Sequence, residues 1–553
     1  MCLNPSSFEE AIHPDNPLAS RWMESMTNEL TGKMKNGKKG FAKVVKLAEA
    51  AANHRRPMKV KWVFKAKLNI DGSIKELKAR LVAKGFVQKK GIDYEATFAS
   101  TIRAATVRLF FALVAKWDLD LALADVVKAF TQAELDKLIY TEMPQGFEQD
   151  GMCLQLFMSL EGMKQSAHLW QKMLADVLVN KLKFERSLVD PCLYTMDDGK
   201  EIKIILIVWV DDIAIGHNSI ATVRTLMKEL NKSINCTFEE KMDSFLGMEI
   251  ARNRKLRTLT ITQKSYITRM FEQHMSAINS KPWKHITPCG TSREDAHRFM
   301  CINPTTNTVE RDMNIKRGFL SMVGALMFAM CFTRPDVAFH ISHLARCMQS
   351  PSTEAYEAVL GVMRYLYHTR DLGISFGPID MNRVNQDTVE YSDPRAWHDA
   401  SFGTREDGFD PYGGGYIEFY YGPITWQARK LKFIPLSTCE AEVGAMVNLS
   451  KEIVFVRNIL IDLKVPLVGP SVMVTDSKAA NDTVVNAGAT KHTVHFERWL
   501  HFARNLHMKN VIKSVLTGTD KMRADDKTKV VDKKKFLMCR RETMNLSAEM
   551  KDS

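Results

Sequence analysis

The chain contains 553 residues, of which 45% are hydrophobic and 25% are charged, and its formal net charge is +13. This length excludes a single hydrophobic core and suits about two to four domains, and the composition is that of an ordinary globular, soluble protein. The excess of Lys and Arg favours a polyanionic partner such as nucleic acid, although many basic proteins bind none. The N-terminus lacks the basic and apolar regions of a signal peptide, and the ten cysteines show no CxxC or zinc-knuckle spacing. They predict reduced thiols in a cytosolic or nuclear setting.

The first 90 residues predict a lead-in followed by a β-hairpin. Residues 1–57 combine a helical pattern with a Lys/Gly-rich tract at 32–40, which is more typical of a solvated loop than of a phosphate site. Lys and apolar residues then alternate in VKWVFKAKL and LKARLVAKGFV, which predicts a cationic row on one face of the hairpin and an apolar row on the other. The cationic row could hold a triphosphate or a template backbone, with a solvated strand face as the alternative: Lys65, Lys78, Arg80 and Lys84.

A helix and an acidic strand are predicted next. Residues 104–117 have the spacing of an amphipathic helix, which ends before a strand-like apolar stretch that carries Asp125. The chain is expected to bend into a loop or helix at 127–129, just before Phe130. From local sequence alone, Phe130 is an ordinary core residue.

Two further stretches contain glycine beside chemically useful residues. SLEGMKQSAHLW precedes a predicted helix at 169–182, and glycine with polar residues at a helix start is typical of a nucleotide approach and equally of a plain cap. FLGMEI at 245–250 predicts an apolar strand whose glycine would let a nucleic-acid backbone come close.

The stretch KIILIVWVDDIAIGH, residues 203–217, is the strongest indication of chemistry in the sequence. Two short apolar runs flank Asp211 and Asp212, which predicts a buried hairpin with both carboxylates at its turn. Adjacent carboxylates repel each other, and a divalent cation would keep them ionised. Together with Asp125 they would hold two Mg²⁺ ions about 4 Å apart, as polymerases do. The alternative is an Asp-Asp turn that simply faces water.

The remaining chain predicts a core helix, a linker and a separate C-terminal unit. Residues 319–332 are apolar but too short to span a bilayer, so they predict a core helix. Residues 376–388 are polar and unpatterned, as in a linker. WHDASFG and GGGYIEFYYGPITWQARK predict strands, LSTCEAEVGAMVNLSKEIVFVRNILIDL predicts a helix, and VMVTDSKAA and ADDKTK follow.

In order along the chain, the motifs from residue 7 to 375 resemble one known family. They are KWVFK, DGSIKELKARLVAKGFVQKKGIDYEATFA, DVVKAF, MPQGFE, SLEGMKQS, WVDD, FLGMEI, TRPDVAF and MRYLYHT. Together they are similar to the reverse transcriptase of copia-type (Pseudoviridae) retrotransposon Pol polyproteins. The resemblance implies an α+β right-hand polymerase with fingers, palm, thumb and connection.

The resemblance also implies roles for particular residues. Asp125, Asp211 and Asp212 would be catalytic and would ligate two Mg²⁺ ions, with Mn²⁺ as a second candidate. Four residues would contact substrate: Lys65 and Arg80 in the fingers, Phe130 as a gate against a 2′-hydroxyl, and Gln165 near the nucleotide. The chain departs from the family at four places: Trp209 replaces Tyr, and Glu161, Ala167 and His168 replace Tyr, Pro and Arg.

The C-terminal third is similar to the ribonuclease H domain of the same elements, an α/β domain with DASWA, STEAEY, DNxxA and ADxLTK motifs that this chain matches imperfectly. By motif position, four carboxylates would bind two Mg²⁺ ions and direct water at an RNA phosphate: Asp399, Glu442, Asp476 and Asp525. Asp393 competes with Asp399, Glu440 with Glu442, and Asp526 lies beside Asp525. A paired-histidine motif of the family would correspond to His495 and His501, although a structural role is an equal alternative.

These observations predict an RNA-directed DNA polymerase with a ribonuclease H domain, acting on an RNA template, a DNA primer, an RNA/DNA hybrid and dNTPs, without a membrane. The alternative is a catalytically decayed or co-opted remnant that binds nucleic acid. The expected location is cytoplasmic, in virus-like particles, with a nuclear phase, and the chain is expected to be a fragment or truncated copy of a polyprotein. The expected divisions are 1–57 lead-in, 58–250 fingers and palm, 251–375 thumb and connection, 376–388 linker, 389–535 ribonuclease H-like domain, and 536–553 tail.

Overall fold

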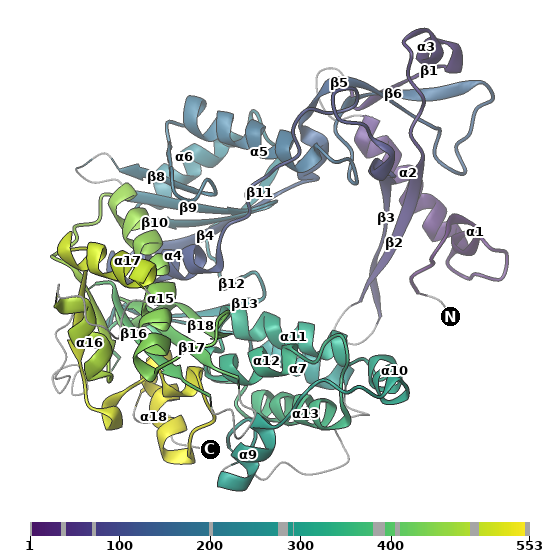
Figure 1. Cartoon of the computed structure of the whole chain (residues 1–553). Coiled ribbons are helices and arrows are strands. Elements are labelled where there is room, and N and C mark those ends of the chain that lie inside the picture. Colours follow the sequence, from purple (N-terminus) through teal and green to yellow (C-terminus); the bar gives the residue numbers. More distant parts are fainter. Residues whose placement is uncertain are drawn as a thin grey trace.

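The computed structural model describes residues 3–34, 40–68, 73–197, 199, 203–274, 286–290, 292–379, 393–403, 410–486 and 497–547. These residues form five β-sheets with helices packed around them (Figure 1). In Figure 1 the N-terminal elements lie at the right and a six-stranded sheet lies at the upper left. The C-terminal half lies below that sheet and to its left.

The N-terminal part contains the predicted hairpin. Its elements are α1 (Phe8–Ala11), α2 (Ala19–Met34), β1 (Ala42–Lys46), α3 (Leu47–Ala52), β2 (Val60–Leu68) and β3 (Ile74–Ala83). β2 and β3 pair antiparallel, and the apolar face packs on α2, where the rings of Phe64 and Trp22 are 5.1 Å apart. Lys65 and Arg80 are exposed on the opposite face. The predicted alternation of an apolar and a cationic face is therefore confirmed.

The six-stranded sheet has the strand order β11-β4-β10-β9-β8-β7. Its strands are β4 (Asp120–Val126), β7 (Glu185–Arg186), β8 (Leu193–Asp197), β9 (Lys203–Trp209), β10 (Asp212–His217) and β11 (Cys236–Glu239). One face packs on α5 (Ser166–Asp176), a π-helix (Val177–Lys181) and α6 (Ile220–Asn231), and the other face packs on α4 (Ala104–Lys116). β5 (Glu134–Thr141) and β6 (Met152–Met158) join β1 in a separate three-stranded sheet. The predicted hairpin at 203–217 and the predicted strand with Asp125 are confirmed.

The middle of the chain forms a small sheet and a group of helices. The strands are β12 (Ser244–Phe245), β13 (Met248–Asn253), β14 (Thr258–Thr262) and β15 (Ile374–Phe376). The helices are α7 (Lys264–Gln273), α9 (Arg293–Met300), α10 (Thr308–Lys316), α11 (Phe319–Phe332), α12 (Ala338–Ala345) and α13 (Thr353–His368). The prediction of one strand at 245–250 is wrong, because Leu246 and Gly247 have positive φ angles of 50° and 75° and make the turn between β12 and β13.

The predicted core helix at 319–332 is confirmed as α11, whose residues Phe319, Met322 and Leu326 are buried. No single described helix is long and apolar enough to cross a bilayer. α10 and α11 meet the length and composition criteria only as a pair, and they are bent by 59° relative to each other.

The C-terminal part is an α/β unit around a mixed five-stranded sheet, in the order β18-β17-β16-β19-β20. Its elements are β16 (Arg395–Ser401), β17 (Tyr412–Phe419), β18 (Gly422–Lys430), α15 (Thr438–Asp462), β19 (Ser471–Thr475), α16 (Lys478–Val485), α17 (Glu497–Met508), β20 (Ile512–Leu516) and α18 (Lys533–Met544). β16, β17 and β18 are antiparallel, whereas β19 and β20 run parallel to β16. The expected fold class, an α+β part followed by an α/β part, is confirmed. Most of the predicted linker at 376–388 lies outside the described residues.

α4 joins the six-stranded sheet to the C-terminal sheet. Every residue from Ala105 to Ala115 is buried, so the prediction of an amphipathic helix with one solvated face is wrong. The helix is covered on both sides because it packs on β18 as well as on the six-stranded sheet. Its basic residues reach the C-terminal unit: Lys116 forms a 2.7 Å ion pair with Asp393, and Arg103 lies over the ring of Phe455.

Arg108 is the central contact of this joint. Its buried guanidinium donates to the Ile424 carbonyl oxygen at 2.6 Å and to the Cys331 carbonyl oxygen, and it lies 4.0 Å from the ring centroid of Trp426. Burial lowers the pKa of Arg108 to about 9. One side chain of α4 therefore contacts both α11 and β18.

We expect Arg108→Ala to lower the free energy of unfolding by about 2–4 kcal/mol, because it leaves a cavity and two carbonyl groups without their donor. Arg108→Met, which keeps most of the volume, should lose less. Urea denaturation followed by tryptophan fluorescence measures both, with Arg269→Ala on the exposed face of α7 as the control. A wild-type denaturation midpoint for Arg108→Ala would contradict this account of the joint.

Candidate active sites

The first candidate site is built by strand register. In the antiparallel pair of β4 and β10, Asp125 lies directly opposite Asp212. Opposite residues in such a pair point to the same face with Cβ atoms roughly 4.5–5.5 Å apart. Asp211 precedes Asp212 in the two-residue turn that connects β9 to β10. Asp125 is thus brought beside the adjacent pair Asp211 and Asp212 at one end of the six-stranded sheet, although it is far from them in sequence.

The turn that carries Asp211 is held by two hydrogen bonds. Val210 has a φ of 57°, a left-handed conformation that a β-branched residue rarely adopts. The indole Nε1–H of buried Trp170, on α5, donates to the Val210 carbonyl oxygen at 2.7 Å. The Val126 amide donates to the Asp211 carbonyl oxygen at 2.9 Å, which ties the turn to β4. The surrounding structure therefore fixes a strained turn at the acidic pair.

The charges at this site oppose one another. Burial, with repulsion from Asp211 and Asp125, raises the pKa of Asp212 to about 6. Burial and Asp211 also raise the pKa of Asp125, and Lys78 and Lys67 in the hairpin act in the opposite direction. A bound cation would relieve this repulsion, and carboxylate oxygens are the ligands that Mg²⁺ prefers. The oxygens of these three acids do not, however, all lie within 4.8 Å of one another.

The β2–β3 hairpin presents its cationic face to the same region. Lys65 lies opposite Lys78, and Arg80 lies opposite Val63, so all four side chains are on the face away from α2. The charges of Lys78 and Lys67 on this face lower the pKa of Asp125, against the effects of burial and of Asp211. Lys65 and Arg80 are exposed and are available to an anion.

Phe130 lies beside the acidic turn, on a short 3₁₀ turn (Ala129–Gln132). The chain bends after β4 because Lys128 has a φ of 52°, as the sequence predicted for 127–129. The half-buried ring lines an apolar cavity of about 130 Å³ together with Trp170, Trp209 and Val210. Phe130 is therefore close to the acidic turn, although five residues separate it from Asp125.

Gln165 has a different environment from the expected one. Its side chain is fully buried, its Nε2 donates to the Asp93 carbonyl oxygen at 2.9 Å, and its Oε1 accepts from Gln88 at 3.0 Å. Both ends of the amide are satisfied inside the protein, so the expectation of a direct nucleotide contact does not fit this geometry. Gln165 instead anchors the chain segment that leads from β3 to α4.

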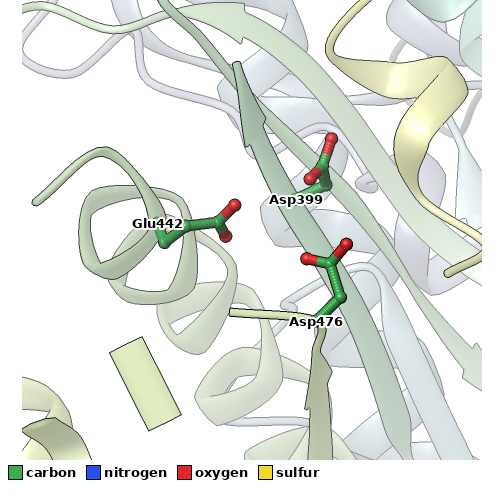
Figure 2. Close-up of side chains that lie close together, drawn as sticks. All are labelled: Asp399, Glu442 and Asp476. Carbon is green, nitrogen blue, oxygen red and sulfur yellow. The ribbon is translucent and has the colours of Figure 1, made fainter. Parts of the chain in front are cut away.

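The second candidate site lies in the C-terminal unit. Asp399 on β16, Glu442 on α15 and Asp476 just after β19 each place a carboxylate oxygen within 4.8 Å of the other two. Figure 2 shows the three side chains pointing toward one another from these separate elements. Among the described residues this is the one group of three His, Cys, Asp or Glu side chains with that spacing. Such a cluster of oxygen ligands suits Mg²⁺ or Mn²⁺.

Glycines on β17 bring the fourth predicted carboxylate to this cluster. Gly414 is the register partner of Asp399, and a Cβ at Gly414 would lie 2.6 Å from the Lys527 carbonyl oxygen. The missing side chain lets the 3₁₀ turn at Asp525–Lys527 pack on the sheet. Thr528 then donates a hydrogen bond to Asp399. Asp525 is not part of the close group of three; its carboxylate binds Lys529 at 2.7 Å and Lys535 at 2.8 Å.

The competing carboxylates lie elsewhere. Asp393 pairs with Lys116 at the α4 joint, and Glu440 accepts the Leu436 amide at the start of α15. Asp526 is buried in an ion pair with Lys527. His501 is exposed on α17, and His495 lies outside the described residues. The geometry therefore favours Asp399 and Glu442 over their sequence neighbours.

Burial dominates the electrostatics of the second site. It raises the pKa of Glu442 to about 8, with further repulsion from Asp476, and raises the pKa of Asp399 to about 7. Glu442 Oε1 accepts the Ala400 amide at 3.1 Å, whereas its Oε2 has no hydrogen-bond partner among the described residues. Lys529 lies 3.4 Å from Asp399 and supplies positive charge between Asp399 and Asp525. Oε2 lies 3.7 Å from Nδ1 of buried His398, too far for a hydrogen bond. An oxygen without a hydrogen bond and the raised pKa values fit a site that takes up a cation.

Comparison with known proteins identifies relatives of the stretch that contains the first site. A family model for reverse transcriptase (RNA-dependent DNA polymerase) matches residues 42–285, which contain the hairpin, Asp125 and the acidic turn. Residues 42–285 are therefore similar to reverse transcriptases. The similarity to whole polyproteins extends beyond these residues. The Pol polyprotein of transposon TNT 1-94 from Nicotiana tabacum is 32% identical over 543 residues. The aligned region covers 97% of this chain and 38% of that polyprotein.

The Pol polyprotein of transposon RE1 from Arabidopsis thaliana is 27% identical over 93% of this chain and 33% of its own length. The chain thus spans less than two fifths of these two relatives. Among solved structures, a foamy viral protease-reverse transcriptase in complex with RNA/DNA hybrid is similar, with a TM-score of 0.43 and 12% sequence identity. The superposition covers 91% of this chain and 54% of the viral chain. The expected resemblance to copia-type Pol polyproteins is confirmed by the sequence relatives.

Sequence reasoning missed residues that shape both sites. Trp170 donates to the carbonyl oxygen of Val210 and so holds the acidic turn. The two residues are 40 positions apart, and the local motif HLW does not indicate this contact. Lys529 ends the motif ADDKTK, in which the adjacent acids Asp525 and Asp526 are the stronger signal of a metal site. The structure also shows the surroundings of two residues that differ from the family pattern. Trp209 lines the cavity under the turn, and His168 Nδ1 lies 2.7 Å from the Phe98 carbonyl oxygen.

We expect Glu442→Gln to be more stable than the wild type at pH 8 in EDTA, by about 1–3 kcal/mol, because it removes a buried, partly unsatisfied carboxylate. The folded-state pKa of Glu442, about 8, lies above its unfolded value, so the wild type loses stability as pH rises toward 8. The difference should vanish near pH 4. Denaturation at both pH values measures it, with Glu452→Gln on the same helix as the control. A difference that does not depend on pH would contradict the assignment.

Proposed function

We propose that the chain is an RNA-directed DNA polymerase with an attached ribonuclease H activity, as in copia-type retrotransposons. The observation that carries the proposal is the register of β4 and β10, which sets Asp125 opposite Asp212 and beside Asp211. The match of residues 42–285 to the reverse transcriptase family supports the assignment of these acids to nucleotide transfer.

In the polymerase site, Asp125, Asp211 and Asp212 would hold two Mg²⁺ ions, which supply Lewis acidity toward the primer 3′-hydroxyl and the triphosphate. The chain supplies position and charge. Lys65 and Arg80, exposed on the cationic face of the hairpin, would bind the triphosphate of the dNTP. Phe130, close to the turn, would lie against the sugar and exclude a 2′-hydroxyl. Trp170 keeps the turn in its strained conformation while primer and dNTP are aligned.

In the second site, Asp399, Glu442 and Asp476 would hold Mg²⁺ or Mn²⁺, with Asp525 as a fourth acid, and the metal would activate water against an RNA phosphate. Glu442 and Asp399 must lose their protons to bind the ion, so binding should strengthen between pH 6 and pH 8. An RNA/DNA hybrid would be recognised through its backbone and 2′-hydroxyls, without base-edge contacts. The working location would be the cytoplasm and virus-like particles, with a nuclear phase.

A second candidate function is nucleic-acid binding without catalysis. It is favoured by Asp525, whose carboxylate is occupied by Lys529 and Lys535, and by the buried environment of Gln165. The net charge of +13 would suffice for binding. The following two measurements separate the candidates.

We expect Asp211→Asn to reduce primer extension on an RNA template with Mg²⁺ by at least about 100-fold, because it removes a charge that the metal site requires. Asp120→Asn, at the far end of β4, is the matched control and should extend normally. If the wild type does not extend, or Asp211→Asn extends equally well, the polymerase assignment is wrong.

We expect Asp476→Asn to abolish cleavage of the RNA strand in a labelled RNA/DNA hybrid while primer extension stays at the wild-type rate. The reason is that Asp476 belongs to the second carboxylate group and to no element of the six-stranded sheet. Asp482→Asn, on exposed α16, controls for loss of a nearby negative charge. Cleavage that survives Asp476→Asn would place the ribonuclease activity elsewhere or deny it.

A further inference from the structure

Lysines occupy both oxygens of the Asp525 carboxylate at the second candidate site. Nζ of Lys529 lies 2.7 Å from Asp525 Oδ1, and Nζ of Lys535 lies 2.8 Å from Oδ2. Asp525 is buried, which strengthens its attraction to both ammonium groups. A metal ion that used Asp525 as a ligand would therefore have to displace one of these two lysines.

The two lysines are held in different ways. Lys535, in the first turn of α18, also donates to the carbonyl oxygens of Thr519 at 2.6 Å and of Asp520 at 3.3 Å. Its side chain is 17% exposed, whereas that of Lys529 is 41% exposed. Lys535 therefore belongs to the packed structure around the turn, and Lys529 is the cation that can exchange with one from solution.

Lys529 also connects Asp525 to Asp399. Its Nζ lies 3.4 Å from Asp399 Oδ2, and the hydroxyl of Thr528 donates to the same oxygen. Asp399 comes from β16 and Asp525 from the 3₁₀ turn, so one ammonium group bridges carboxylates of two separate elements. Metal ions bridge carboxylates in this way in two-ion sites. The ammonium group thus lies between the two acids that a second ion would bridge.

Three carboxylates form a ligand set for one ion. Asp399, Glu442 and Asp476 each place an oxygen within 4.8 Å of the other two, and Asp525 is outside this group. The three side chains point toward one another in Figure 2. Glu442 Oε2 is buried and has no hydrogen-bond partner among the described residues. An unpaired oxygen at the centre of this group indicates a place for a cation.

The charges around the site also match one divalent ion. Its four carboxylates carry four negative charges when ionised, and Lys529 and Lys535 carry two positive charges. Buried His398 adds no charge, because burial favours the neutral imidazole. Two negative charges remain among these described residues, which one divalent ion neutralises. A second ion would leave an excess of positive charge in a buried place.

We propose that the ammonium group of Lys529 takes the place of one of the two metal ions that the resemblance to ribonuclease H domains implies. The second site would then bind one Mg²⁺ or Mn²⁺ ion through Asp399, Glu442 and Asp476, while Lys529 neutralises Asp399 and Asp525. The proposal rests on the proposed ribonuclease function, yet bound ions can be counted without any cleavage.

The test counts the Mn²⁺ ions bound by the full chain at pH 8, with free Mn²⁺ measured by electron paramagnetic resonance at equilibrium. Asp399→Asn/Asp476→Asn removes two of the three ligands, so the difference from the wild type counts the ions of the second site alone. We expect this difference to be one ion per chain. A cooperative unfolding transition in EDTA shows that the variant is folded.

Substitutions of Lys529 test its role directly. Lys529→Met frees Asp525 Oδ1 and should add one ion per chain, and Lys529→Met/Asp525→Asn should return the count to that of the wild type. Lys529→Arg keeps the positive charge and should bind no additional ion. Lys534→Met removes an exposed lysine from the same turn of α18 as Lys535, and this matched control should bind like the wild type.

The possible outcomes separate this proposal from the ribonuclease function. A loss of two ions in Asp399→Asn/Asp476→Asn, or an unchanged count in Lys529→Met, overturns the role of Lys529 and leaves the ribonuclease function standing. A loss of no ion refutes metal binding at the second site and the ribonuclease function with it. A wild type that binds one ion there but cleaves no hybrid would refute the ribonuclease function and not the role of Lys529.

Discussion

Repulsion among gathered carboxylates is the constraint on which both candidate sites depend. At the end of the six-stranded sheet, burial and repulsion from Asp211 raise the pKa of both Asp125 and Asp212. In the C-terminal unit, burial raises the pKa of Asp399 and of Glu442. Neither arrangement stabilises the fold by itself. The cost is offset by the apolar cores on both faces of the six-stranded sheet and around α15. A rigid scaffold thus keeps together charges that would otherwise separate.

α4 makes that scaffold continuous. Its apolar residues pack against the six-stranded sheet. Arg108, Arg103 and Lys116 contact the C-terminal unit. Because α4 is buried on every side, close packing fixes its position relative to both sheets. The distance between the polymerase site and the second carboxylate group is therefore set by packed side chains. An RNA/DNA hybrid spanning both would meet a fixed spacing.

The periodicity of side chains along the sequence predicted the elements that depend on neighbouring residues. The alternation in β2 and β3, the apolar runs that flank Asp211 and the core helix at 319–332 follow from side-chain periodicity, and the structure has them. What failed depends on distant partners. The full burial of α4 requires β18, the enclosure of Gln165 requires Gln88 and Asp93, and the hairpin at Leu246–Gly247 requires backbone angles that an apolar stretch does not reveal.

The excess positive charge is used in two different ways. On the β2–β3 hairpin Lys65 and Arg80 are exposed, and exposed cations attract polyanions over a distance limited by salt screening. At the second site Lys529 is placed inside the carboxylate group, 2.7 Å from Asp525 and 3.4 Å from Asp399. There it balances negative charge in the absence of metal, and a bound cation must compete with it. The lysines of the hairpin thus leave their charge on the surface, whereas Lys529 balances the negative charge of Asp399 and Asp525.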